Sequence, residues 1–286
     1  MELSKKLVIT ADDFGISEEA NIAIKKAFCE GLLTSTCIMA NGEAFEHAIE
    51  LLGDFKEIGM GIHLNIIEGK SLLSPEKVST LCDKNGDYNN GFAALLAKSS
   101  NPIFLNEVEA DFRKQIEKIL DHTAVSHINS HVHTHAIPNL FKITCKLAKE
   151  YGIRYVRSQT EIPYIIPSLS KNLQLRYPIN LVKAALLGAF STINQETLRE
   201  YDLLTNDYFI GVAYTGYMDE NALRYGLRNI KKDRLVEVIL HPTVDESKKD
   251  NYQEFLSFIN PELKAEIENS GWELTSHARL LPQEVR

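Results

Sequence analysis

Residues 6–31 read KLVITADDFGISEEANIAIKKAFCEG and lay out a strand, a turn and a helix in order. Residues 6–10 are a short apolar run rich in aliphatic side chains, which is typical of a buried strand. Ser17 can cap a helix whose first turn carries two acids, and Gly31 can end that helix. The stretch therefore predicts a strand that is followed by a helix over residues 18–30.

The alternation of strand and helix signals continues along the chain. Further strands are predicted at residues 33–39, 58–64, 125–131, 153–156, 209–213 and 235–240. Further helices are predicted at residues 43–52, 105–120, 137–151 and 220–230. Repeated strand–helix units predict an α/β fold with a parallel sheet, either open or closed into a barrel. Residues 66–104 and 160–206 break the pattern, and we expect them to be insertions that act as lids or substrate walls.

Composition narrows the class of protein. A chain of 286 residues with 44% hydrophobic and 24% charged residues is typical of a globular protein, with one barrel-sized domain or two smaller ones. Its net charge of −8 argues against a nucleic-acid partner. Its apolar runs are too short for a signal-peptide core or a membrane span, and its four cysteines form no CxxC pair. These features predict a cytoplasmic protein without a membrane or nucleic-acid partner.

Four of the nine histidines lie close together in the chain, and they are His127, His131, His133 and His135. In a strand, alternate residues share one face, so these four rings could all project the same way. Imidazole is the commonest protein ligand for metals. The cluster therefore favours a metal site, and the alternative is a polar strand at the surface.

The polar residues follow the ends of the predicted strands. In parallel α/β folds, catalytic groups gather where the strands end at their carboxyl side. Five strand ends here carry titratable groups, and these are Asp12 with Asp13, His63, the histidine cluster, Arg157 and His241. A random surface would not sort such groups in this way, so the pattern favours a functional site.

Combining Asp13, His63 and one cluster histidine gives two imidazoles and one carboxylate, with positions left open for water or substrate. Such a set suits zinc, or a harder divalent ion such as manganese or magnesium. Asp12 and His241 remain as a candidate general base and general acid. Taken alone, each residue could also have a purely structural role. The two aspartates could form a turn, His63 could be a hydrogen-bonded residue of the core, and His241 could simply end a strand.

Several segments together resemble the YdjC-like carbohydrate deacetylases, a family that includes chitooligosaccharide deacetylase. The resemblance extends from residue 7 to about residue 242 and is densest in the first half of the chain. Its motifs are TADDFGIS at 10–17, GLLTST at 31–36, MANG at 39–42, GIHL at 61–64 with Glu68-Gly69, SHINSHVH at 126–133 and Leu240-His241-Pro242. The combination is specific, although no single motif is.

The resemblance implies an irregular (β/α) barrel related to the polysaccharide deacetylases, as a single domain over residues 1–286 with the two insertions. It implies that Asp13, His63 and His131 bind one divalent metal ion, magnesium or zinc. It also implies that Asp12 is the base and His241 the acid.

One position departs from the family pattern, since the family usually has aspartate where this chain has Asn129. We expect Asn129 to orient a cluster histidine by a hydrogen bond, without adding a charge. His133, His135 and Arg157 are expected to support the metal ligands or to face the substrate.

The function predicted from these residues and the resemblance is removal of an N-acetyl group from a small amino sugar or chitooligosaccharide, with release of acetate. Two alternatives stay open: a metal-dependent phosphoesterase or amidohydrolase, and a saccharide-binding protein with a degenerate site. A homodimer is the commonest assembly for such proteins and is a further expectation.

Overall fold

The structure is a computed structural model that describes residues 5–167, 176–230 and 234–281. Its strands form one sheet in the order β5-β4-β3-β2-β1-β7-β6, with β8 paired to β1, and neighbouring strands run parallel. The strands are β1 Lys5–Phe14, β2 Ser35–Ile38, β3 Gly59–Leu64, β4 His127–Ser130, β5 Tyr155–Val156, β6 Tyr208–Ile210, β7 Leu235–Leu240 and β8 Trp272–Leu274. The sheet is a half-barrel, which confirms the expected irregular α/β barrel.

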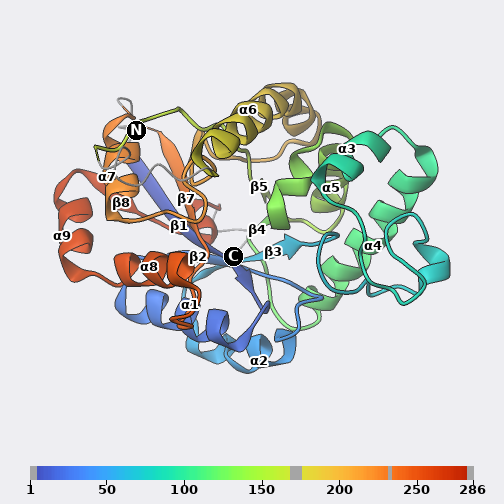
Figure 1. Cartoon of the computed structure of the whole chain (residues 1–286), viewed down its shortest axis with the longest axis horizontal. Coiled ribbons are helices and arrows are strands. Elements are labelled where there is room, and N and C mark those ends of the chain that lie inside the picture. Colours follow the sequence, from blue (N-terminus) through green and yellow to red (C-terminus); the bar gives the residue numbers. More distant parts are fainter. Residues whose placement is uncertain (1–4, 168–175, 231–233, 282–286) are drawn as a thin grey trace.

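Helices surround this sheet on all sides (Figure 1). They are α1 Glu18–Glu30, α2 Phe45–Glu50, α3 Phe92–Lys98, α4 Pro102–Leu120, α5 Pro138–Glu150, α6 Arg176–Tyr201, α7 Glu220–Arg228, α8 Lys249–Phe258, α9 Pro261–Asn269 and α10 His277–Leu280. Short 3₁₀ helices cover Leu52–Asp54, Pro75–Lys77 and His131–Ala136. Among the described helices, none is both long and apolar enough to cross a membrane.

The first strand and helix form as the sequence predicts. The Ser17 side chain accepts a hydrogen bond from the backbone N–H of Ala20 at 3.2 Å, so it caps α1 as expected. The helix ends at Glu30, and the backbone N–H of the following Gly31 donates to the carbonyl oxygen of Ala27. Strand β1 lies at the centre of the sheet, where it pairs with β2, β7 and β8. The carboxyl end of β1 is therefore flanked by β2 on one side and β7 on the other.

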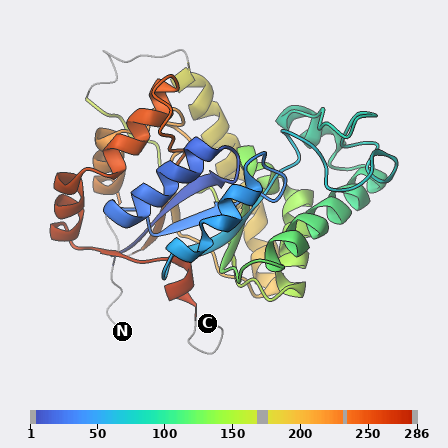
Figure 2. The ribbon, with the colours of Figure 1, turned by 90° about the horizontal axis from the view of Figure 1, so that it is seen from below.

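The first predicted insertion packs against α4. The segment between β3 and α4 extends from the body of the protein beside α4 (Figure 2). Buried Asp111 of α4 anchors it by accepting hydrogen bonds from the hydroxyls of Ser71 and Tyr88, each at 2.6 Å. In the second insertion, residues 168–175 lie outside the described residues, and the long helix α6 follows them.

Candidate metal centre and catalytic groups

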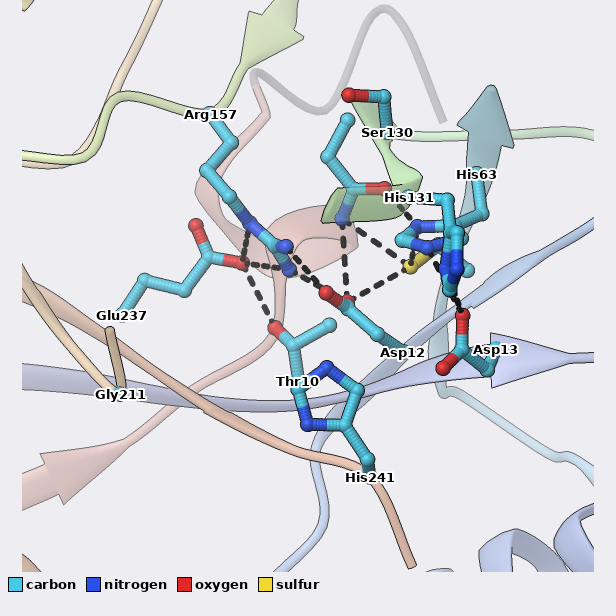
Figure 3. Close-up of polar contacts among 12 residues, drawn as sticks. Thr10, Asp12, Asp13, His63, Ser130, His131, Arg157, Gly211, Glu237 and His241 are labelled. Carbon is cyan, nitrogen blue, oxygen red and sulfur yellow. Dashed lines mark hydrogen bonds and ion pairs between the residues drawn. The ribbon is translucent and has the colours of Figure 1, made fainter. Parts of the chain in front are cut away.

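Three sequence-predicted residues converge at the carboxyl end of the sheet (Figure 3). Asp13 Oδ1 lies 2.9 Å from His131 Nδ1 and 3.1 Å from His63 Nε2. One donor atom from each of the three side chains lies within 4.8 Å of the others. The group combines the end of β1, the end of β3 and the turn after β4, and it forms a compact set of two imidazoles and one carboxylate.

A bulge in β1 directs Asp13 toward the histidines. The pairing of β1 with β2 shifts register between Ala11 and Phe14, so Asp13 lies in an irregular part of the strand. Its φ of 67° is in the left-handed region, which aspartate tolerates better than most residues. The bulge lets adjacent carboxylates, Asp12 and Asp13, face different partners.

The donor atoms fit a divalent metal ion. Although His63 Nε2 is close to Asp13, the contact lacks hydrogen-bond geometry, and this buried nitrogen has no hydrogen-bond partner among the described residues. The other ring nitrogen, Nδ1, contacts Asn129 Oδ1 at 2.6 Å. A metal-binding histidine is typically held in this way, with an oxygen acceptor on the nitrogen that faces away from the metal. Two imidazoles and a carboxylate are also a usual ligand set for zinc.

The electrostatic environment favours a cation at this point. Burial lowers the pKa of His131, but the charge of Asp13, a hydrogen bond to it and the nearby Glu68 raise this pKa to about 10. Burial raises the pKa of Asp13, but His131 and His63 hold it well below its usual range. A metal ion and a proton compete for the same nitrogen, so surroundings that stabilise the protonated ring also favour a metal ion.

The second carboxylate, Asp12, faces a buried arginine instead. Arg157 donates from Nη1 to Asp12 Oδ2 at 2.6 Å and from Nη2 to Asp12 Oδ1 at 2.8 Å. It also donates from Nε and Nη2 to Glu237 Oε1, at 3.0 and 2.8 Å. Burial raises the pKa of Asp12, but the charges of Arg157 and His63 hold it well below its usual range. Asp12 is therefore a carboxylate at neutral pH.

Arg157 is fully buried between these two carboxylates, so it contacts the candidate base Asp12 directly. Glu237 was not anticipated, although a single acid within the buried strand LVEVIL is a signal that could have identified it. Cys37 was also missed. Its Sγ contacts Asp12 Oδ1 at 3.0 Å, and a lone cysteine in the short strand STCI gave no sign of this contact.

The expectation that Asn129 orients a cluster histidine is wrong, because it contacts His63. The parallel register of β3 and β4 places His63 directly opposite Asn129. The Asn129 amide also donates to Cys37 Sγ at 3.1 Å and to Asp12 Oδ1 at 3.3 Å. Asn129 therefore links the candidate metal ligand His63 to the second carboxylate, Asp12.

The expectation that the four cluster histidines project one way is also wrong. Strand β4 ends at Ser130, and positive φ values at Val132 (52°) and His133 (58°) turn the chain immediately afterwards. Within the cluster, only His131 contacts Asp13.

The other three cluster histidines are buried in separate places. His127 stacks on His277 with ring centroids 3.8 Å apart. His133 packs edge-on against Phe209. His135 lies between the Ser130 hydroxyl and the carbonyl oxygen of Arg157. None of these rings faces open solvent.

The burial of His135 predicts a loss of stability in acid. Burial and the charge of Arg157 lower the pKa of His135 to about 3, whereas histidine in an unfolded chain titrates near 6.5. Between these values the unfolded chain binds a proton that the folded chain excludes, so the free energy of unfolding falls as the pH falls. With chelator present, urea unfolding should show wild type losing roughly 1–2 kcal/mol more than His135→Gln between pH 7 and pH 5. Parallel losses in both proteins would contradict this.

The candidate acid, His241, follows β7 at the same end of the sheet (Figure 3). Its backbone N–H donates to Glu254 Oε2 at 2.7 Å, and its Nδ1 lies 3.9 Å from the same oxygen. Burial lowers the pKa of His241, although Asp13 and Asp12 act in the opposite direction. The side chain keeps 25% of its exposure, so a substrate can reach it.

Comparison with known proteins identifies the family. A family model described as "YdjC-like protein" matches residues 6–269. A carbohydrate deacetylase of Clostridium beijerinckii is 32% identical over 186 residues, which are 64% of this chain and 73% of that protein. A carbohydrate deacetylase of Listeria monocytogenes is 28% identical over 263 residues, which are 91% of this chain and 89% of that protein.

A solved structure shares the fold. It is a candidate cellobiose-phosphate cleavage protein from Enterococcus faecalis V583, and it superimposes with a TM-score of 0.75 at 21% sequence identity. The match covers 98% of this chain and 100% of that chain. At this identity the likeness establishes the fold alone.

Proposed function

Because the chain belongs to the YdjC-like protein family, we propose that it is a metal-dependent carbohydrate deacetylase that removes the N-acetyl group of a small amino sugar or chitooligosaccharide. The names of its relatives support the reaction class. The observation that carries the proposal is the convergence of Asp13, His63 and His131 beside an ionised Asp12. The products are acetate and a free amino sugar.

The proposed metal ligands are Asp13, His63 and His131. When bound by these residues, a divalent ion would supply a lowered pKa for its water and polarisation of the acetyl carbonyl. Two imidazole ligands favour zinc, because imidazole is a softer ligand than the oxygen atoms that magnesium prefers. Magnesium is the alternative, because the family resemblance leaves it open.

The two remaining groups move the protons. As the water oxygen attacks the carbonyl carbon, Asp12 accepts the proton that the water loses. Arg157 keeps Asp12 ionised and fixes both of its oxygens. When the C–N bond breaks, His241 donates a proton to the departing nitrogen, which would otherwise leave as a poor leaving group. Burial lowers the pKa of His241, so once protonated it releases that proton readily.

Removal of the metal is expected to abolish turnover. Wild-type protein with added zinc or magnesium should release acetate from di-N-acetylchitobiose. Dialysis against a chelator should reduce this release to background, and restoring the ion should recover it. Acetate is measured by a coupled enzymatic assay. Asp13→Ala is the control, and adding metal to this variant should not restore its activity.

Three other results would point elsewhere. Acetate release that survives chelation would remove the metal from the reaction. Phosphate release from generic phosphate esters, without acetate release from the sugar, would favour a phosphoesterase. Saccharide binding without turnover in metal-loaded protein would favour a saccharide-binding protein with a degenerate site.

A further inference from the structure

A carboxylate that has no role so far lies beside the outer face of His131. Glu68 Oε1 is 3.6 Å from His131 Nε2, while the other ring nitrogen of His131 faces Asp13 Oδ1 at 2.9 Å. The Glu68 side chain is 61% exposed, whereas that of His131 is 12% exposed. Glu68 therefore lies at the rim of the site and borders the one cluster histidine that reaches the metal-binding group.

The surroundings of the two candidate metal-binding histidines match. In His63, Nε2 faces Asp13 and Nδ1 contacts the Asn129 side-chain oxygen. In His131, Nδ1 faces Asp13 and Nε2 faces the Glu68 carboxylate. Each ring thus has one nitrogen directed at the shared carboxylate and the other directed at an oxygen acceptor on a different element. Such an acceptor fixes both the tautomer and the orientation of a metal-binding histidine.

The backbone of Glu68 is fixed by hydrogen bonds to the buried side chain of Asn65. Asn65 Oδ1 accepts hydrogen bonds from the backbone N–H groups of Ile67 and Glu68, at 3.0 and 3.1 Å. Asn65 Nδ2 donates to the Glu68 carbonyl oxygen at 2.7 Å. The backbone of Asn65 is in turn bonded through both its N–H and its carbonyl to the side chain of Gln115 in α4. These hydrogen bonds hold Glu68 at a set position next to His131, although its side chain is exposed.

We infer that Glu68 is a positioning residue: its exposed carboxylate lies 3.6 Å from the outer ring nitrogen of His131, needs only a small side-chain movement to accept the N–H of that nitrogen, and thereby orients the ring and strengthens metal binding. The inference rests on the proposed metal site and adds a residue to it. Loss of an acceptor of this kind typically weakens metal affinity by roughly 10–100-fold. Because Glu68 is exposed, the effect belongs near the lower end of that range.

The test measures zinc affinity without substrate. Metal-stripped wild type, Glu68→Ala and Glu68→Gln are titrated with zinc against a chelator of known affinity. Glu68→Ala should bind zinc about 10-fold more weakly. Glu68→Gln keeps an acceptor oxygen and should recover part of that loss. Asp87→Ala is the matched control, since Asp87 is an acid of the same segment with a half-exposed side chain paired to Lys70, and its loss should leave zinc affinity unchanged.

The outcomes separate this inference from the proposed function. Glu68→Ala that binds zinc as tightly as wild type would overturn the inference even if wild type releases acetate. An equal loss of zinc affinity in Asp87→Ala would also overturn the inference, because the loss would then come from the change in net charge. Wild type that binds zinc but releases no acetate would overturn the deacetylase proposal and leave the Glu68 result standing.

Discussion

Replacing Asp12 by asparagine is expected to lower kcat for acetate release by roughly 10²–10⁴-fold, while the metal content stays at the wild-type level. The amide has the shape of the carboxylate but cannot accept a proton from the attacking water. Arg157 retains its bonds to Glu237, so the variant should fold. Steady-state acetate release and the metal content of purified protein are the two measurements.

Asp13→Asn is the matched control for this prediction. Asp13 is the adjacent residue, but it faces both histidines of the candidate metal site, whereas Asp12 faces Arg157. Asp13→Asn should therefore lose metal and activity together. If Asp12→Asn keeps full activity, or if it loses metal as Asp13→Asn does, the division of roles between the two aspartates is wrong.

Replacing Arg157 by methionine is expected to lower the free energy of unfolding by about 3–5 kcal/mol, because it leaves two buried carboxylates without their partner. Asp12 and Glu237 keep 2% and 0% of their exposure, so water cannot replace the guanidinium. Urea unfolding at pH 7 measures the loss. Addition of Glu237→Gln to this variant should recover part of it, since one uncompensated charge is then removed.

Lys25→Met is the control for an ordinary ion pair. Lys25 pairs with Asp54 at 2.6 Å, but the two side chains are 39% and 46% exposed, so this pair should contribute less than about 1 kcal/mol. If Arg157→Met lowers the free energy of unfolding no more than Lys25→Met does, then the buried ion pairs of Arg157 contribute little to stability.

Local signals made the fold predictable. The cap at Ser17, the end at Gly31 and the apolar run of β1 are properties of neighbouring residues, and the structure forms the first strand and helix accordingly. Strand β7 has the predicted bounds for the same reason. The short strand β8 escaped prediction because its three residues, WEL, carry too little pattern to be recognised.

Parts of the site depend on contacts between distant segments, and these could not be read from the chain. Which residue faces His63 is decided by the register of β3 and β4, and a shift of one position would have placed another side chain there. His277 showed no functional context in the sequence, yet the pairing of β8 with β1 carries the chain to where His277 is fully buried against His127. Strand ends predicted the position of the site, but not the partner of each side chain.

The most direct test of the account is the position of a metal ion. Crystals grown with zinc should give an anomalous peak within bonding distance of Asp13, His63 and His131, about 2.0–2.2 Å from each ligand atom. Data collected on both sides of the zinc absorption edge identify the element at that peak. A peak elsewhere in the molecule, or no peak in crystals of protein that releases acetate, would contradict the metal centre proposed for this chain.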